Sequence, residues 1–222
     1  MTATHSGSGS GIVRLIFIPS VVTLIITILR LIGELQHWSR VWFNPTAGGG
    51  GAIIGITWLA PIFGVYFALK LSGAGEGLER VGRAIMLAVL GLIVMIGGSF
   101  MAFAPFIQFP GKLAVGFLLI LAGAALQLPA WPALFKTLLA YGYTARIPVA
   151  LVMFFAIQGH WGTHYDALPP EFPQMSFWPT YVMTALLPQL VFWVAFTVIV
   201  GSLFGGIASA IFARRMSVSP AH

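Results

Sequence analysis

The chain contains no cysteine and very few charged residues. The absence of cysteine excludes disulfides, thiolate metal sites, covalent haem attachment and cysteine nucleophiles. Only 11 Lys and Arg and 5 Asp and Glu occur among 222 residues, so charged residues make up 7% of the sequence. Soluble domains carry about 25% charged residues. The chain therefore lacks the side chains from which a water-facing surface is built.

Nucleotide-binding signals are also missing. No segment has the form Gly-x-x-x-x-Gly-Lys-Ser/Thr, which binds nucleotide phosphates. The longest stretch between apolar runs, residues 158–177, is too short to fold as a separate domain. These two absences argue against a self-contained ATP-driven pump.

Apolar residues dominate instead, at 59% of the chain. A transmembrane helix needs about 20 predominantly apolar residues, and six runs reach or approach that length: residues 12–35, 51–71, 81–103, 113–128, 134–157 and 180–213. The last run is longer than a bilayer requires, and Pro188 predicts a kink near its first third. The sequence therefore predicts an all-α, polytopic transmembrane helical bundle with about six spans.

Basic residues predict the orientation of this bundle, because they concentrate in cytoplasmic loops. One predicted side carries seven of them and the other side two: Arg14, Lys70, Arg80, Arg83, Lys136, Arg214 and Arg215 against Arg40 and Lys112. We therefore expect both termini in the cytoplasm and the bacterial inner membrane as the location. Residues 1–11 are predicted to be a disordered tail, residues 12–213 one transmembrane domain, and residues 214–222 a short cytoplasmic tail.

The expected partners follow from charge and from small residues. The basic residues that give the chain its net charge of +6 lie mostly between apolar runs. This position indicates anionic lipid headgroups, and not nucleic acid, as their partners. Gly51 and Gly55 are four residues apart, as are Gly201, Gly205 and Ser209. Such spacing lets helix backbones approach closely. It predicts compact packing within the bundle, or contact with a second copy of the chain or with another membrane protein.

A first group of polar residues ends the first predicted span. Arg30, Glu34 and His37 are four and three residues apart, so they share one face if the helix continues. Glu34 and His37 have the Glu-x-x-His spacing that carboxylate metal sites use.

A second group, His160, His164 and Asp166, lies in the loop at residues 158–177 on the same side of the membrane. Imidazoles and carboxylates are ligands of zinc, iron and manganese. We predict Glu34, His37, His160, His164 and Asp166 as candidate ligands of a divalent metal, and we predict no other cofactor. The alternatives are a hydrogen-bonded polar cap, a surface where a solute enters, or a docking surface for a partner.

Arg146 lies inside the fifth predicted span, about 15 Å along a helix from Lys136. A charged side chain at that depth is costly and should face the bundle interior, a cavity or an acid. We predict Arg146, Tyr143 and Gln189 as substrate-binding candidates, because an interior arginine suits an anion. The alternatives are an arginine that reaches the inner interface and a structural ion pair.

Three functions are compatible with these features. Transport or permeation of a small solute or ion predicts a polar cavity that reaches Arg146 and is lined by residues such as Gln127, Tyr143, Thr144 or Gln189. An accessory or scaffold subunit of a membrane complex predicts no polar interior cavity. An outer-face metal-dependent enzyme requires the predicted ligands to converge. We favour transport over catalysis.

Overall fold

The structure is a computed structural model. It describes residues 7–170 and 172–218, with the side chains of residues 11–170 and 172–212; residues 1–6, Glu171 and residues 219–222 lie outside the described part of the chain. Every regular element in the described ranges is a helix, and these ranges contain no strand. The all-α fold class that the sequence predicts is therefore confirmed.

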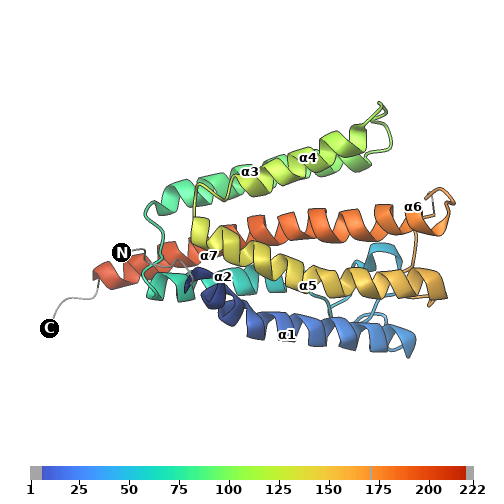
Figure 1. Ribbon diagram of the computed structural model, residues 1–222, viewed down its shortest axis with the longest axis horizontal. Coiled ribbons are helices and arrows are strands. Elements are labelled where there is room, and N and C mark those ends of the chain that lie inside the picture. The colour runs from blue at the N-terminus through green and yellow to red at the C-terminus, as the bar shows by residue number, and fades with distance from the viewer. Residues whose placement is uncertain (1–6, 171, 219–222) are drawn as a thin grey trace.

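The helices run side by side along the long axis of the molecule, and the start of α1 and the end of α7 lie at the same end of the bundle (Figure 1). We call this the terminal end, and the other the loop end. Helix α7 lies inside the bundle, in contact with α2, α3, α4 and α5. In chain order the elements are α1 (Gly7–Leu35), η1 (Ala47–Gly49), α2 (Leu59–Gly73), α3 (Val81–Phe103), α4 (Lys112–Ala125), α5 (Pro132–Gly159), α6 (Phe177–Tyr181), η2 (Val182–Leu186), η3 (Pro188–Phe192) and α7 (Trp193–Val218).

Four helical segments in the described residues are long and apolar enough to cross a membrane: Gly11–Leu35, Val81–Phe103, Pro132–Gly159 and Phe177–Phe212. Helices α2 and α4 have 15 and 14 residues, or roughly 21–23 Å, which is less than the hydrocarbon thickness of about 30 Å. The chain is thus a helical membrane protein in which two of the six predicted runs form shorter helices.

Outward-facing side chains agree with a lipid environment. On α1, Val13, Phe17 and Ile18 are each more than 60% exposed, and the exposed apolar face continues to Leu35. The interior holds a separate set of fully buried side chains, including Phe67, Leu134 and Ile199. A soluble helix would turn its polar face outward, so the solvent for α1 is hydrocarbon.

Helix α1 begins at Gly7, inside the tail predicted to be disordered up to Gly11, and α7 continues to Val218. Residues 1–6 and 219–222 of the two predicted tails lie outside the described residues. Helix α2 differs more: it begins at Leu59 and not at residue 51. The φ angle of Gly51 is 81°, a left-handed conformation that interrupts a right-handed helix. Gly51 and Gly55 therefore lie in a loop, and the prediction that they pack helices is wrong.

The segment from Phe177 to Phe212 is continuous but irregular. Two π-helical turns, η2 and η3, lie between α6 and α7, and Pro188 opens the second. Proline has no N–H to donate, and π-helical turns are a recognised way for a helix to absorb a local irregularity. The structure therefore has π-helical turns at the position where the sequence predicts a kink.

Small residues bring α7 close to its neighbours. A Cβ on Gly64 of α2 would overlap the backbone of Gly201 in α7, and a Cβ on Gly205 would lie 2.9 Å from the Cβ of Ala68. Helices α3 and α4 meet through two further pairs, Gly91 with Gly123 and Gly98 with Gly116. The predicted small-residue face on α7 thus serves packing within one chain.

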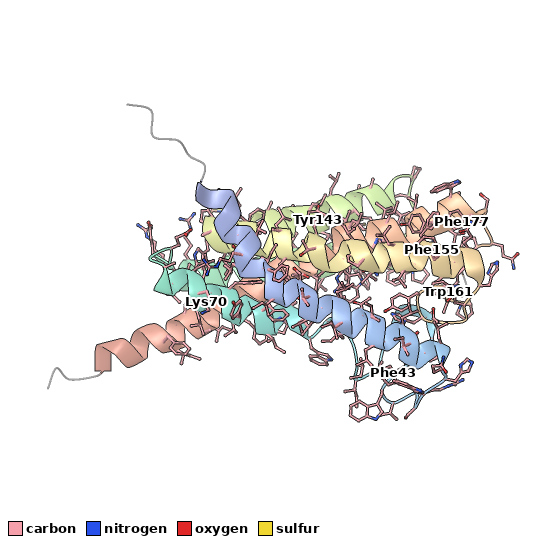
Figure 2. The ribbon with its side chains drawn as sticks, turned by 60° about the horizontal axis from the view of Figure 1, so that its bottom comes forward. Phe43, Lys70, Tyr143, Phe155, Trp161 and Phe177 are labelled. Carbon is pink, nitrogen blue, oxygen red and sulfur yellow. The ribbon has the colours of Figure 1, made fainter. Side chains whose placement is uncertain are left out.

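Tryptophan and phenylalanine side chains gather at the loop end. Figure 2 shows Phe43, Trp161 and Phe177 there and Lys70 toward the terminal end. Trp38 and Trp178 are 46% and 64% exposed. Tryptophan is enriched where a membrane meets water, so the loop end has side chains typical of a membrane–water interface.

Replacing Gly64 with Ala should destabilise the protein, whereas Gly97→Ala should leave it unchanged or slightly more stable. Alanine favours a helix over glycine by about 1 kcal/mol, but at Gly64 its Cβ overlaps Gly201 and adds a packing penalty of about 1–3 kcal/mol. Gly97 lies within α3 with no heavy atom within 4 Å of the added Cβ. Melting temperatures in mild detergent test this pair, and equal values for both variants would contradict the proposed α2–α7 approach.

Candidate functional site

Arg30 and Glu34 form an ion pair near the end of α1. The Arg30 Nε donates to Glu34 Oε1 at 2.9 Å, since residues four apart lie on one helix face. The side chain of Glu34 has no exposed surface and that of Arg30 is 12% exposed. A buried carboxylate is tolerated only when its charge is compensated, so this pairing allows Glu34 to lie inside the bundle.

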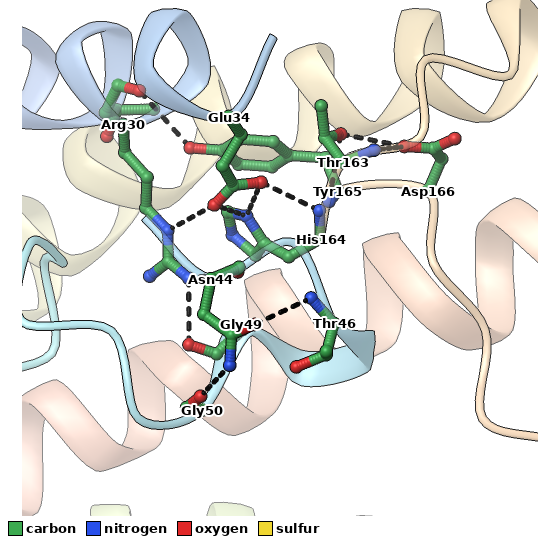
Figure 3. Close-up of polar contacts among 11 residues, drawn as sticks. Arg30, Glu34, Asn44, Thr46, Gly49, Gly50, Thr163, His164, Tyr165 and Asp166 are labelled. Atoms are coloured by element: carbon green, nitrogen blue, oxygen red, sulfur yellow. Dashed lines mark hydrogen bonds and ion pairs between the residues drawn. The ribbon is translucent and has the colours of Figure 1, made fainter. Parts of the chain in front are cut away.

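His164 completes the coordination of Glu34 from the loop between α5 and α6 (Figure 3). Its backbone N–H donates to Glu34 Oε2 at 2.8 Å. Its ring Nδ1 lies 2.7 Å from Oε2 and 2.6 Å from Oε1. The carboxylate therefore joins α1 to a segment 130 residues further along the chain, and the two predicted ligands Glu34 and His164 do meet.

The ring of His164 is neutral at pH 7, because burial lowers its pKa and nearby Arg30 lowers it further, while the contact with Glu34 acts in the opposite direction. A carboxylate only accepts hydrogen bonds, so the ring hydrogen lies on Nδ1 and Nε2 keeps its lone pair. The neighbouring Tyr165 is 3% exposed and donates to the carbonyl of Thr27 at 3.2 Å. Burial raises the pKa of Tyr165, which keeps its hydroxyl protonated.

Arg30 also anchors the loop that follows α1. Its Nη2 donates to the carbonyl of Gly49 at 2.8 Å and is 3.4 Å from that of Asn44. Asn44 in turn donates to the carbonyl of Gly50 at 2.6 Å. Gly49 has a φ angle of 60°, and a Cβ there would overlap Arg30 and lie 2.7 Å from the ring of His164. Only glycine fits this close approach.

His37 and His160 end helices and do not join this group. Both are exposed and have left-handed backbones, with φ angles of 52° and 50°. The next residue bonds back five positions in each case, from Trp38 to Gly33 and from Trp161 to Ala156, which is the Schellman arrangement of a helix end. Because α1 stops at Leu35, the Glu-x-x-His spacing of Glu34 and His37 no longer shares a face.

Asp166 is occupied within its own loop. Its carboxylate accepts from the backbone N–H of Gly162 at 2.9 Å, and from the N–H and hydroxyl of Thr163 at 2.8 and 2.7 Å. In the described part of the chain, no three His, Cys, Asp or Glu residues are placed so that they could hold a metal ion. The structure therefore gives no support to a five-ligand metal site.

A cavity of about 340 Å³ lies next to His164 at the loop end. Most of its wall is apolar, from α5, the α5–α6 loop and the η2–α7 segment. Its side chains with hydrogen-bonding groups include Thr27, Arg30, Thr57, Arg146, His164 and Gln189. Largely apolar pockets with a few convergent polar groups are typical of small-molecule sites.

Arg146 is the buried charge of this cavity. It is the fifteenth of the 28 residues of α5, and it is 5% exposed, so it does not reach the interface. Its Nη1 donates to Gln189 Oε1 at 3.3 Å, and its guanidinium lies 4.7 Å from the ring of Trp193. Its Nε is buried and has no hydrogen-bond partner. No ion pair involves Arg146 among the described residues.

Two of the three predicted substrate-binding residues lie together, and the third does not. Arg146 and Gln189 meet in the cavity, whereas Tyr143 is 41% exposed and is not part of the cavity wall. Three contributors lacked a sequence signal: Trp193, which reads as an ordinary apolar residue, Asn44, which bonds through its side-chain amide and its carbonyl, and Gly49, which accepts through its carbonyl.

Acidification should destabilise the protein through His164. The folded-state pKa of His164 lies below the ordinary value of about 6.5. In the pH interval between these two pKa values, the unfolded chain therefore binds more protons than the folded chain. The free energy of unfolding is therefore highest above about pH 6.5 and falls as the pH drops through the interval. We expect His164→Asn, whose amide can still donate to Glu34, to reduce the loss of melting temperature between pH 7.5 and pH 5.5.

The matched control is His160→Asn. Asparagine tolerates the left-handed conformation at this helix end, and the exposed ring of His160 has no role in Glu34 coordination, so the wild-type loss should persist. An unchanged loss in His164→Asn would show that another group controls the acid response.

The loop end thus brings together an anchored, compensated carboxylate and a cavity that a neutral histidine lines with Arg146, an arginine that has no acidic partner among the described residues. Such an arrangement can bind a small anion by charge-assisted hydrogen bonds. It offers no described set of metal ligands. No family model, no curated protein and no solved structure matches the chain.

Proposed function

We propose that the protein binds a small organic anion in the loop-end cavity and passes it across the membrane. The observation that carries the proposal is Arg146, a buried guanidinium whose Nε has no partner and which lines that cavity. An uncompensated buried charge is strongly unfavourable. A bound anion removes that cost, because it supplies the negative charge that the described protein groups do not.

The charges around the cavity support a singly charged anion. Glu34 already neutralises Arg30, and His164 is neutral, so Arg146 contributes one positive charge that no described acidic group balances. The volume of about 340 Å³ is near the lower end of the 300–1,000 Å³ typical of small-ligand sites. A monocarboxylate with a short apolar body fits these two constraints, since the planar guanidinium matches a carboxylate.

Passage of the anion needs a change in the bundle. Between Thr137 and Arg146, which line different cavities, α5 contributes buried Leu138, Tyr141 and Ala145. This packed layer separates the loop-end cavity from the terminal end. The π-helical turns η2 and η3 adjoin the cavity at Gln189, and interrupted helices at binding sites are common in transporters. We assign the movement to this segment.

The scaffold alternative predicts no polar interior cavity, so the cavity around Arg146 favours transport over it. The lining reaches Arg146 and Gln189 but does not include Gln127, Tyr143 or Thr144. The enzyme alternative requires Glu34, His37, His160 and His164 to converge, and of these Glu34 and His164 meet. Transport is therefore the function with the most support.

We also propose that the terminal end faces the cytoplasm, in the bacterial inner membrane, with α2 and α4 completing six membrane segments. The support is the distribution of charge and the shared position of the start of α1 and the end of α7 (Figure 1). A groove at the terminal end is lined by five Lys and Arg residues, and positive residues favour the cytoplasmic side. The lipid bilayer is then the one partner required.

Arg146→Gln should weaken anion binding at least about tenfold, because hydrogen bonds to charged groups contribute roughly 1.5–3 kcal/mol. Without added anion, its melting temperature should equal or exceed that of the wild type, since the substitution removes an uncompensated buried charge. Acetate, propionate and lactate, each beside its neutral amide, are the ligands for thermal-shift titration and for flux into proteoliposomes.

The control for this experiment is Arg40→Gln, which removes an exposed arginine at the same end of the bundle and should leave binding and flux unchanged. Two results contradict the proposal: a wild-type flux no greater than that of protein-free vesicles, or equal responses to the carboxylates and their amides. A large fall in the anion-free melting temperature of Arg146→Gln would indicate a structural role instead.

A further inference from the structure

The terminal end contains a second, larger cavity. This groove has a volume of about 1480 Å³ and is bounded by the start of α1, the end of α2, the α2–α3 loop and the start of α5. It exceeds the range of about 300–1,000 Å³ that small-molecule sites occupy. A ligand that filled it would be larger than the anion proposed for the loop end.

Basic side chains from four segments converge on this groove. They outnumber the acidic ones by five to two: Arg14, Lys70, Arg80, Arg83 and Lys136 against Glu76 and Glu79. A general preference for positive charge at the cytoplasmic interface needs no shared concave surface. Here the cations of α1, α2, α3 and α5 line one cavity, so the groove carries an excess of three positive charges that suits a phosphate group.

Another part of the wall is apolar and exposed on α1. Val13, Phe17 and Ile18 of α1 line the groove and are 63–66% exposed. The groove also reaches the packed interior, since Leu71 and Thr137 line it and are 7% and 0% exposed. It therefore offers a charged region and an adjoining apolar surface that is continuous with the bilayer-facing side of α1.

A partly buried hydrogen bond holds part of the groove wall in place. Trp131 is 5% exposed, and its indole N–H donates to the carbonyl of Glu76 at 2.8 Å. This bond ties the α2–α3 loop to the residue that precedes α5. The loop positions Arg80 at the start of α3, and Lys136 lies in the second turn of α5.

We infer that this groove binds an anionic phospholipid of the surrounding bilayer, with the phosphate among the basic side chains and an acyl chain along α1. A phospholipid joins the two chemistries that the groove presents. Basic pockets between transmembrane helices recognise anionic headgroups in this way. A soluble phosphate would use the cations but leave the apolar wall unoccupied. The inference does not depend on anion transport.

The test uses the full chain, purified in mild detergent, stripped of lipid, and titrated with phosphatidylglycerol, cardiolipin, phosphatidylcholine or inorganic phosphate. Melting temperature and native mass spectrometry report stability and bound lipid. We expect phosphatidylglycerol or cardiolipin to raise the melting temperature and remain bound, and phosphatidylcholine and phosphate to do neither. An equal effect of phosphatidylcholine, or of phosphate, would overturn the inference.

The variant that removes the charge is Arg80→Gln/Arg83→Gln/Lys136→Gln. All three side chains are exposed, so folding in phosphatidylcholine should be normal. Each basic residue near an anionic surface contributes roughly a factor of five, so binding should weaken about a hundredfold. Arg40→Gln/Lys112→Gln removes two basic residues at the loop end and should bind like the wild type. If the two variants lost affinity equally, the groove would have no special role.

Discussion

The arrangement of the loop end depends on the compensation of one buried carboxylate. Glu34 accepts hydrogen bonds from Arg30, from the backbone of His164 and from its ring. Arg30 lies on α1 itself, whereas both His164 donors come from the α5–α6 loop, which Tyr165 also ties to α1 through the carbonyl of Thr27. The charge on Glu34 therefore helps to hold the α5–α6 loop against α1, and it pairs with the arginine that binds Gly49. Loss of that charge would weaken the attachment of the α5–α6 loop and leave Arg30 without its acidic partner.

The two interior arginines illustrate how the same residue type serves opposite purposes. Arg30 is paired with Glu34 and bonded to backbone carbonyls, so its donors are engaged in holding structure. Arg146 has a neutral partner in Gln189 and an aromatic one in Trp193. An aromatic face and an amide oxygen orient a guanidinium but do not neutralise it. Arg146 is thus held in position while its charge stays available, which is the condition that an anion site requires.

The helical bundle was predictable because bilayer thickness imposes long apolar runs, and composition alone reveals them. Some boundaries were predictable as well, since the run at residues 81–103 coincides with α3. The polar group was predictable only in part. Residue types placed Glu34 and His164 at one end of the bundle, but their contact joins positions 130 residues apart. The left-handed backbones of His37 and His160 depend on how two helices end, and helical spacing cannot reveal them. Nor does spacing show that Arg146 faces Trp193 and not lipid.

The separation of the two cavities follows from how tightly the helices pack between them. Gly64 and Gly201 allow α2 and α7 to touch. This contact holds α7 tightly against its neighbour in the part of the bundle between the two cavities. The next part of the same segment, η2 and η3, replaces regular hydrogen bonding with π-helical turns around Pro188. One helical segment therefore combines a tightly packed half with an irregular half, and the irregular half carries Gln189. Because a packed interface resists deformation, any motion of this segment concentrates beside Arg146, where the anion would bind.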